Sequence, residues 1–488
     1  MAIATYSANY YDRLGLDRGC DARLLKSQYR MLARLYHPDV NPSQNAKQQF
    51  IGLQEAYQIL GNEEKRRDYD QWLQRELRHG QPLRLELQLS PERLIRPYGP
   101  QRVYALLTVN ILAEAAHKGA PLNVVLVLDR SSSMKGSRLH YVKEAARRIL
   151  SQLSPKDTFG IVAFNDRANV VFPASPASDT QVARTAIDGI TPSGGTEIAS
   201  GLRTGIQEVI RYHRPNVLSH VLLLTDGRTY GDEEMALEIA RQASDLQIGI
   251  TALGLGTDWN DSFLDELSSR TGGSSHFIAQ ADQAVEIFQE QLQQLQRTFA
   301  RKAKLRLDLG PNVELLQAHE IAPGLRRLPT ERNEVALGPL SATPTLRVLL
   351  DLKVSLPIID VALLGQIRLG AQLVENSSRV EVERLAVAEI HAGEPKAPPD
   401  EIYEAAQRVA TLKLQERAWA AIEQGAVQQA VDTLEQLAAR FLEIGADNLA
   451  MATQREMALF QSTGALSDDG RKIIKYGTRM LALPAPVD

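Results

Sequence analysis

The fold is decided by residues 123–134, NVVLVLDRSSSM, in which an unbroken apolar run ends in a carboxylate and two hydroxyls follow at alternate positions. Such a run predicts a strand buried on both faces, as in a parallel sheet covered by helices. Ligand sites of these sheets lie just beyond the carboxyl ends of the strands. We therefore expect the oxygens of Asp129, Ser131 and Ser133 to converge on the loop that leaves this edge. Oxygen-only ligands suit Mg²⁺, with Mn²⁺ and Ca²⁺ as alternatives.

Taken alone, this D-x-S-x-S pattern also fits a solvated strand-to-helix turn with an N-cap serine. Two later stretches favour the metal interpretation. Residues 191–196, TPSGGT, place another hydroxyl on a glycine-rich loop, whose backbone can approach a ligand closely. Residues 221–227, VLLLTDG, form a second apolar run that ends in a carboxylate. The three stretches together predict a single cation site.

These stretches resemble the von Willebrand factor A (vWA) domain family, in which the same pattern forms a metal-ion-dependent adhesion site. The resemblance covers residues 119–299 and implies an α/β, doubly wound, Rossmann-like domain. Ser132 stands where glycine is frequent in the family, but that position is not a ligand. The resemblance implies five metal ligands in this chain, namely Asp129, Ser131, Ser133, Thr196 and Asp226.

The hydrophobic pattern inside residues 119–299 supports this fold, because strand-like and helix-like segments alternate as they do in a doubly wound sheet. The expected order is a strand that ends at Asp129, helix 138–153, strand 158–164, helix 197–212, a strand that ends at Asp226, helix 232–246 and strand 248–255.

Length and composition indicate a multidomain globular protein. A chain of 488 residues is too long for one ordinary core and suggests about three domains. The formal net charge of −4 gives no general attraction to nucleic acid. A single cysteine, Cys20, excludes an internal disulfide framework and a CxxC zinc module. We find no signal peptide and no apolar run near the ~18 residues of a membrane span, so we expect a cytoplasmic protein.

The pattern of residues 1–78 is helical. A helix over residues 21–36 carries its basic side chains on one face and apolar side chains on another. Proline disfavours α geometry in the residue before it, so this helix should end near Tyr36 and expose the following tripeptide HPD in a loop. A second helix starting near Ser43 would complete an antiparallel hairpin. The basic face consists of Arg23, Lys26, Arg30 and Arg34, and the second helix would bury Phe50, Leu53, Tyr57 and Leu60.

This N-terminal pattern resembles the J-domain of DnaJ-type co-chaperones, with Tyr29-Arg30, Leu32-Ala33, Tyr36-His37-Pro38-Asp39, Ala56-Tyr57 and Leu60 in the family's order and spacing. The resemblance implies that His37, Pro38 and Asp39 stimulate ATP hydrolysis by a DnaK-type Hsp70 partner, on which the basic face docks. If this resemblance is set aside, the basic face is interpreted as a solvated helix surface and the HPD tripeptide as a plain turn. The glycine/phenylalanine-rich linker and cysteine zinc module of full-length DnaJ are missing, so client handling is expected in the other domains.

Two segments that flank the vWA-like region, residues 81–118 and 300–394, carry the alternating apolar pattern of half-buried strands. A linker at residues 79–82 precedes the first of them. Neither segment has enough strands to be comfortably stable by itself. We predict one β-sandwich built from both, with the vWA-like domain inserted between them. Two separate small sheets are the alternative.

Residues 395–488 are rich in alanine and glutamine and predict helices, with Trp419, Ile422, Leu434, Leu437 and Phe441 at helical spacing. No fixed period is evident, so we predict a small helical bundle rather than a helix-pair repeat. The segment also resembles those that end some bacterial vWA proteins. Residues 471–479 are basic, and we interpret them as a solvated or docked terminal segment rather than a nucleic-acid site.

The motifs favour protein binding over catalysis. The sequence contains no G-x-x-x-x-G-K-[ST] loop, no G-x-S-x-G elbow and no H-E-x-x-H pair, so we expect no enzyme. An open position on the cation would take a carboxylate from another protein, and binding would then require the metal. The first hypothesis is an Hsp70 co-chaperone that holds a client or partner protein through the vWA domain. The alternative is a non-catalytic scaffold subunit of a larger assembly, with the J-domain as a docking handle.

Overall fold

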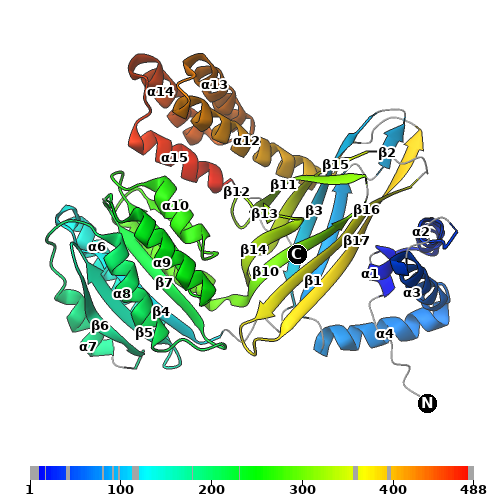
Figure 1. The fold of residues 1–488 in the computed structure, drawn as a ribbon, viewed down its shortest axis with the longest axis horizontal. Helices are drawn as coiled ribbons and strands as arrows, with labels where there is room; N and C mark the ends of the chain where they lie inside the picture. The colour runs from blue at the N-terminus through cyan, green and yellow to red at the C-terminus, as the bar shows by residue number, and fades with distance from the viewer. Residues whose placement is uncertain are drawn as a thin grey trace.

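The computed structural model of the chain contains four folded parts (Figure 1). An α/β domain lies on the left of the figure, a β-sandwich in the centre, the N-terminal helices on the right and the C-terminal helices above. The structure describes residues 10–16, 18–39, 44–79, 82–90, 93–96, 99–112, 120–178, 180–229, 231–310, 312–355, 361–392 and 397–481. The predicted linker residues Gly80 and Gln81, and the predicted helix start at Ser43, lie outside these ranges.

The N-terminal part is a helical hairpin with a short helix before it and a long one after it: α1 (Tyr10–Leu14), α2 (Ala22–Leu35), α3 (Gln44–Leu60) and α4 (Glu63–His79). The Asp21 side chain caps α2 by accepting a hydrogen bond of 2.6 Å from the Leu24 amide. Helix α2 ends one residue before Tyr36, as the following proline predicts. Leu25, Leu32, Leu53 and Leu60 are buried, whereas Phe50 and Tyr57 are partly buried.

The α/β domain is built on one six-stranded sheet. Its strand order is β6 (Ala168–Pro176), β5 (Thr158–Phe164), β4 (Leu122–Asp129), β7 (Leu218–Thr225), β8 (Gly249–Leu255) and β9 (Ser275–Ile278). All neighbours are parallel except β5 and β6. Every residue of β4, β5 and β7 is buried, as the unbroken apolar runs predict.

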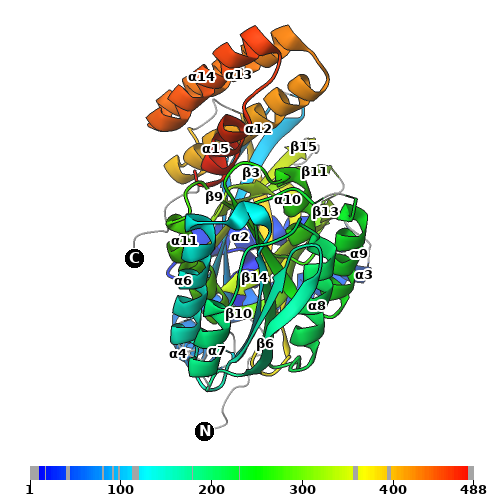
Figure 2. The same cartoon turned by 90° about the vertical axis from the view of Figure 1, so that its left-hand side faces the viewer.

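Helices cover both faces of this sheet (Figure 2). One face carries α6 (Ser137–Gln152), α7 (Thr180–Asp188) and α11 (Gln283–Gln296). The other carries α8 (Ile198–Ile210), α9 (Glu233–Asp245) and α10 (Asp261–Ser269). Val124 and Leu126 of β4 belong to the first core and Val125 and Val127 to the second, because successive side chains of a strand point to opposite faces. The fold is therefore doubly wound, as predicted.

The β-sandwich combines strands from before and after the α/β domain. One sheet has the order β1 (Leu83–Ser90), β3 (Gln101–Ile111), β15 (Leu346–Val354), β11 (Val313–Ala322) and β12 (Arg326–Arg327). The other has the order β13 (Thr330–Glu331), β14 (Glu334–Ser341), β10 (Thr298–Leu309), β16 (Val361–Leu373), β17 (Arg379–Ala392) and β2 (Arg93–Arg96). Leu107 of β3 pairs with Val348 of β15, so one sandwich is formed across the inserted domain. The alternative of two separate sheets is wrong.

The C-terminal helices are α12 (Asp400–Glu423), α13 (Val427–Glu443), α14 (Asp447–Thr463) and α15 (Asp468–Arg479). Gly425 and Gly445 follow α12 and α13 with φ of +69° and +73°, values that glycine adopts without steric cost. Helix α12 lies on the outer face of the β3–β15–β11 sheet, where Leu106 and Leu349 contact its apolar residues. The predicted C-terminal helical region is confirmed.

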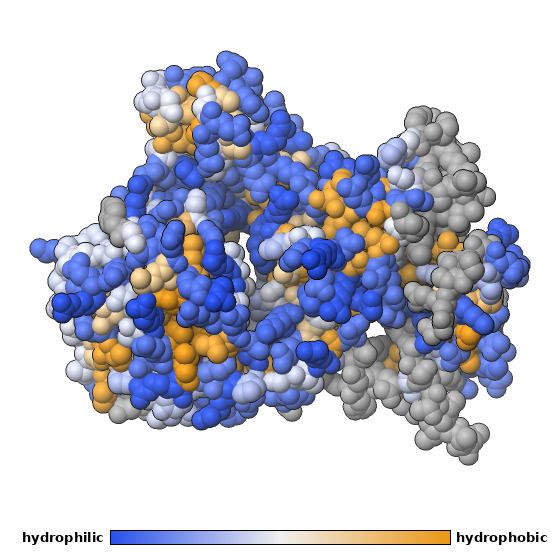
Figure 3. Space-filling view, viewed as in Figure 1, coloured by the Kyte–Doolittle hydropathy of each residue, from blue (hydrophilic) through white to orange (hydrophobic). Residues whose placement is uncertain are grey.

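The surface in Figure 3 is predominantly hydrophilic on the face that it draws. Within the part of the chain that the structure describes, none of the helices combines the length and the apolar character required to cross a membrane.

Arg384 fixes the N-terminal helices to the β-sandwich. Its Nη1 donates to Asp12 Oδ1 at 2.6 Å and to the Leu16 carbonyl at 3.1 Å, and its Nε donates to the Leu85 carbonyl at 3.1 Å. The neighbouring Leu385 side chain packs into the core of the hairpin domain. Because Arg384 is only 7% exposed, this node is shielded from solvent and joins three segments of the chain.

We predict that Arg384→Met releases α1 from β17. The substitution keeps much of the apolar stem but removes the guanidinium, which leaves Asp12 and two carbonyls without that donor at a cost of roughly 1–3 kcal/mol. Faster amide hydrogen exchange in α1 would report the release. The control is Arg379→Met, which changes an exposed arginine of the same strand. Unchanged amide exchange in α1 of Arg384→Met would show that the contacts of Leu385 alone hold α1 on β17.

Candidate functional site

Asp129 is held at the carboxyl end of the central strand β4. Its Oδ1 accepts a hydrogen bond of 2.8 Å from the Ser131 amide, and its Oδ2 accepts one of 2.7 Å from the Thr225 hydroxyl at the end of β7. The residue is fully buried, and burial raises the pKa of Asp129 to about 6, although the hydrogen bonds from Thr225 and Ser131 oppose this effect. The parallel pairing of β4 with β7 thus fixes the carboxylate at the edge where the sequence predicts a site.

The other predicted ligands gather around Asp129. The hydroxyls of Ser131 and Ser133 are 2.9 Å apart, and the Ser133 hydroxyl donates to Asp226 Oδ1 at 2.7 Å. The Thr196 hydroxyl lies against the loop that carries Asp226, because a Cβ atom added to Gly227 would be 3.2 Å from it. The structure therefore brings the five predicted residues together from three loops.

The glycine-rich loop is pinned to the loop after β4. The Ser132 amide and hydroxyl each donate to the Gly194 carbonyl at 3.0 Å, and the Ser193 amide donates to the Arg130 carbonyl at 2.7 Å. On its other side the Gly195 amide donates to Asp166 at 3.0 Å. Ser132 consequently has a structural role, and neither it nor Asp166 was among the predicted site residues.

Arg138 contacts a predicted ligand but was not among the predicted site residues. Its Nη1 donates to Asp226 Oδ2 at 2.6 Å, although the two residues are 88 positions apart. The available sequence signal was weak, namely a basic residue at the start of the helix that leaves the predicted site. Because Asp226 is buried, this ion pair compensates a carboxylate that would otherwise be costly.

The donor set fits a hard divalent cation. Two carboxylates and three hydroxyls supply only oxygen, which is the preference of Mg²⁺ and Ca²⁺. In the described ranges no group of three or more His, Cys, Asp or Glu side chains is placed to hold a metal ion, so a nitrogen- or sulfur-rich centre is not formed there. If a cation binds at this edge, its protein ligands are the residues that the sequence predicts.

The N-terminal hairpin presents a second candidate site. The four predicted basic side chains on α2, those of Arg23, Lys26, Arg30 and Arg34, are all exposed. The hairpin behind them is closed by a parallel stack of the Tyr29 and Tyr57 rings, whose centroids are 4.0 Å apart. A rigid scaffold therefore carries the basic face.

The HPD tripeptide follows α2 directly. The Asp39 amide donates to His37 Nδ1 at 3.3 Å, and the His37 ring meets the edge of the Phe50 ring with a centroid distance of 5.5 Å. The Asp39 side chain is 86% exposed. His37 is thus anchored on α3, while the Asp39 carboxylate points to solvent and can contact another protein.

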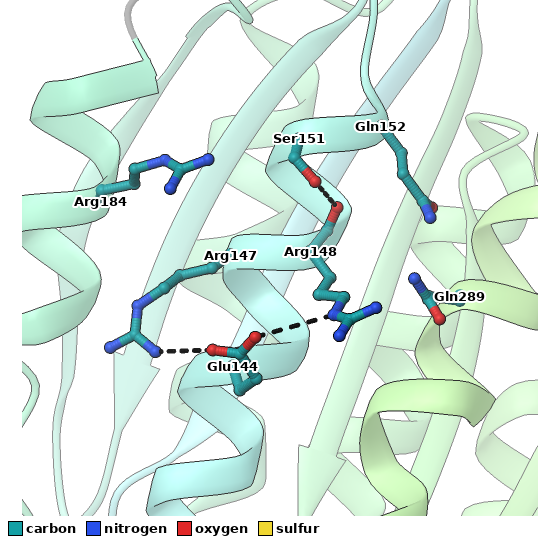
Figure 4. A pocket seen from close by; sticks show the side chains of 7 residues that line it. All are labelled: Glu144, Arg147, Arg148, Ser151, Gln152, Arg184 and Gln289. Carbon is teal, nitrogen blue, oxygen red and sulfur yellow. Dashed lines mark hydrogen bonds and ion pairs between the residues drawn. The ribbon is translucent and has the colours of Figure 1, made fainter.

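A shallow depression of about 370 Å³ lies on the other end of α6 (Figure 4). Arg147, Arg148 and Arg184 line it, but Glu144 pairs with both Arg147 and Arg148. Helix α6 begins at Ser137, and its first residue to line the depression is Glu144, so about two helical turns, or roughly 10 Å, separate the near edge of the depression from the start of the helix beside the oxygen cluster. The depression is therefore not part of the candidate metal site.

The basic terminal helix α15 docks on the α/β domain. Lys472 donates to the Trp259 carbonyl at 2.9 Å, and the Tyr476 ring lies 5.8 Å from the Trp259 ring. Arg479 Nη1 donates to Asp265 Oδ1 at 2.9 Å. Residues 471–479 are therefore a docked segment rather than a solvated one.

One contact links this helix to the candidate metal site. Arg228, two residues beyond Asp226, pairs with Asp468 at the start of α15 at 3.3 Å. The pair is exposed at both ends, so its energetic contribution is small. The contact nevertheless shows that the start of α15 lies close to the loop that carries Asp226.

We predict that Asp265→Asn loosens α15. Burial acts to raise the pKa of Asp265, but the bonds from Arg479 and Lys475 outweigh it and lower this pKa to about 2. A depressed folded-state pKa stabilises the fold above the ordinary value of 3.8 and loses that effect as the pH falls toward 2. We expect the variant to lose about 2 kcal/mol at pH 7.

Urea unfolding followed by tryptophan fluorescence measures this difference. The gap between wild type and Asp265→Asn should shrink between pH 4 and 2, because the wild-type carboxylate is then protonated too. Asp469→Asn is the control, since it changes an exposed carboxylate of α15 itself. A gap that did not depend on pH would contradict the electrostatic explanation.

Comparison with known families assigns domains to three parts of the chain. Residues 9–70 match the DnaJ domain, residues 123–296 the von Willebrand factor type A domain, and residues 400–484 the Sll0103-like, C-terminal alpha-helical domain. Most of the described chain is thereby assigned, and the two resemblances seen in the motifs are confirmed.

Individual relatives match different parts of the chain. Protein sll0103 of Synechocystis sp. is 29% identical over 293 residues, which are 58% of this chain and 70% of that protein. The chaperone protein DnaJ of Prochlorococcus marinus is 49% identical over 65 residues, but the match covers 13% of this chain and only 17% of that protein. A von Willebrand factor type A structure from Catenulispora acidiphila has a TM-score of 0.67 at 16% identity and covers 83% of this chain and 99% of that one, a likeness of fold.

Proposed function

We propose that this chain, which contains a DnaJ domain and a vWA domain, is an Hsp70 co-chaperone that binds a client or partner protein through a divalent cation. The observation that supports the proposal is that two candidate sites, the exposed basic face with its HPD loop and the oxygen cluster, lie on separate parts of the chain. The basic face and HPD loop lie at one end of the β-sandwich, and the oxygen cluster lies on the domain at the other end (Figure 1). Neither function requires the chain itself to be an enzyme.

The J-domain would act through charge and geometry. Arg23, Lys26, Arg30 and Arg34 form a positive face that would steer the domain onto an acidic Hsp70 surface in a salt-dependent way. Pro38 fixes the backbone between its neighbours, so the exposed Asp39 carboxylate is presented in one orientation for charge-assisted hydrogen bonds. The stack of Tyr29 on Tyr57 packs α2 against α3.

We predict that His37→Gln abolishes stimulation of the Hsp70 ATPase. The change removes the imidazole ring, which contacts Phe50 and accepts a hydrogen bond from the Asp39 amide. The orientation of the HPD loop is then lost. Steady-state ATP hydrolysis by a purified DnaK-type Hsp70 should return to its basal rate, while cation-dependent partner binding stays intact. His140→Gln, an exposed histidine on α6, should stimulate like wild type. Stimulation that survived His37→Gln would remove the Hsp70 half of the proposal.

The vWA domain would hold the ligand protein. A Mg²⁺ ion, with Mn²⁺ or Ca²⁺ as alternatives, would be held by Asp129, Ser131, Ser133, Thr196 and Asp226 and would accept a carboxylate from the bound protein. This chain's residues would orient the ion: the hydrogen bonds of Asp129 to Ser131 and Thr225 leave the carboxylate little freedom to turn. Capture of the ligand protein would then require the cation.

We predict that Asp129→Asn abolishes cation uptake. Losing one of two carboxylates should weaken Mg²⁺ binding by more than the roughly 10–100-fold that is typical of a lost supporting residue. Isothermal titration calorimetry with MgCl₂ measures the affinity, and Ser131→Ala provides a milder variant. Asp245→Asn, on the exposed face of α9, is the matched control. A wild-type protein that took up no Mg²⁺, Mn²⁺ or Ca²⁺ would refute the metal-dependent half of the proposal.

A scaffold role is the second candidate, because α15 ties the C-terminal helices to the vWA domain and offers a composite surface next to the metal site. Pull-down with and without chelator separates the two functions. Recovery of Hsp70 together with misfolded clients supports the co-chaperone, whereas one partner at fixed stoichiometry supports the scaffold.

A further inference from the structure

Arg138 lies beside the oxygen cluster but is not one of its predicted ligands. It is the second residue of α6, which begins just beyond the loop that carries Ser131 and Ser133. Its side chain is 33% exposed, whereas the Asp226 side chain that it contacts at 2.6 Å is fully buried. The guanidinium therefore reaches into the site from the surface and keeps part of its area in solvent.

Gly256 leaves room for this guanidinium at the rim. Gly256 follows β8 with φ of +69°, and a Cβ atom added there would lie 3.3 Å from Nη2 of Arg138. A guanidinium has five N–H donors in a planar fork, and the bond to Asp226 uses one of them. Donors thus remain at the rim for a ligand.

Two other arginines near the site are bound elsewhere. Arg130 donates to the Ser193 hydroxyl at 2.9 Å, and Arg228 pairs with Asp468. Of these three arginines, Arg138 is the one that contacts a predicted metal ligand. Its charge therefore acts most directly on the cation and on what the cation binds.

We infer that Arg138 makes the metal site specific for a protein segment with two neighbouring carboxylates, one for the cation and one for the guanidinium. This inference rests on the proposed cation site. Asp129 and Asp226 contribute two negative charges and Arg138 one positive charge, so a divalent cation brings the site to a net charge of +1. Without Arg138 the loaded site would be neutral. A positive site with a planar fork favours a paired acidic motif over a single carboxylate.

The same charge acts against the cation itself. The guanidinium occupies Asp226 Oδ2 and repels a second positive charge nearby. Arg138 therefore has opposite effects on its two ligands, because it weakens cation binding and strengthens binding of the acidic segment. A residue with a merely structural role would weaken both when it is replaced.

The first measurement is calorimetric titration of the full chain with Mg²⁺ alone. Arg138→Gln should bind Mg²⁺ about tenfold more tightly than wild type, since a neighbouring charge shifts such equilibria by an order of magnitude or more. Arg138→Lys keeps the charge and should bind Mg²⁺ like wild type. The control Arg148→Gln changes an exposed arginine of the same helix and should have no effect.

The second measurement is fluorescence anisotropy of two labelled peptides in saturating Mg²⁺. One peptide carries a Glu-Glu pair, and the other has Gln in place of the second Glu. Wild type and Arg148→Gln should prefer the Glu-Glu peptide by roughly tenfold, the size expected for one charge-assisted hydrogen-bond pair. Arg138→Gln should bind the two peptides equally, and Arg138→Lys should retain only part of the preference because it lacks the fork.

The outcomes separate this inference from the proposed function. Equal Mg²⁺ affinity in wild type and Arg138→Gln, or a Glu-Glu preference that survives in Arg138→Gln, would overturn the inference and leave the cation site standing. Failure of the wild-type chain to bind Mg²⁺, Mn²⁺ or Ca²⁺ would overturn the cation site and the inference together. Should Arg138→Gln fail to fold, the peptide preference of Arg138→Lys tests the inference instead. An undiminished preference for the Glu-Glu peptide in that variant would contradict the role of the planar guanidinium.

Discussion

The pairing of β3 with β15 is the constraint on which the rest of the molecule depends. In the sequence, β3 precedes the inserted vWA domain and β15 follows it. Their antiparallel pairing, with Leu107 opposite Val348, joins the two parts of the sandwich. The sandwich in turn supports the other parts, because the J-domain is bound to β17 through Arg384 and α12 lies over Leu106 and Leu349. The two candidate sites are thus joined through one antiparallel ladder.

Sequence patterns predicted the features that are decided by burial. The strands β4, β5 and β7 were predictable since a strand covered on both faces must be apolar throughout, and α2 ended where Pro38 required. Strand β6 and helix α7 were not among the predicted elements. Strand β6 lies at the antiparallel edge of the sheet, is partly exposed and contains two prolines, so it has neither a continuous apolar run nor a clean alternation. Local pattern carries little information about such an edge.

The candidate site divides in the same way. Its five oxygen-bearing residues follow strand ends or a glycine-rich turn, and such positions can be predicted from the sequence alone. The role of these residues as metal ligands stays a prediction. Arg138 could not be predicted, because its importance comes from a carboxylate 88 positions away, and the same holds for Arg479 and Asp265. Charge partners across a fold depend on how the elements pack, which spacing along the chain does not encode.

The β-sandwich also acts as a spacer. A compact protein seated on the cation would stand a whole domain away from any chaperone bound to the basic helix (Figure 1). An unfolded segment would extend from the cation toward the basic helix, since each extended residue adds about 3.3–3.6 Å. In the proposed function, this architecture would therefore favour a bound protein with a long unfolded segment over a tightly folded one.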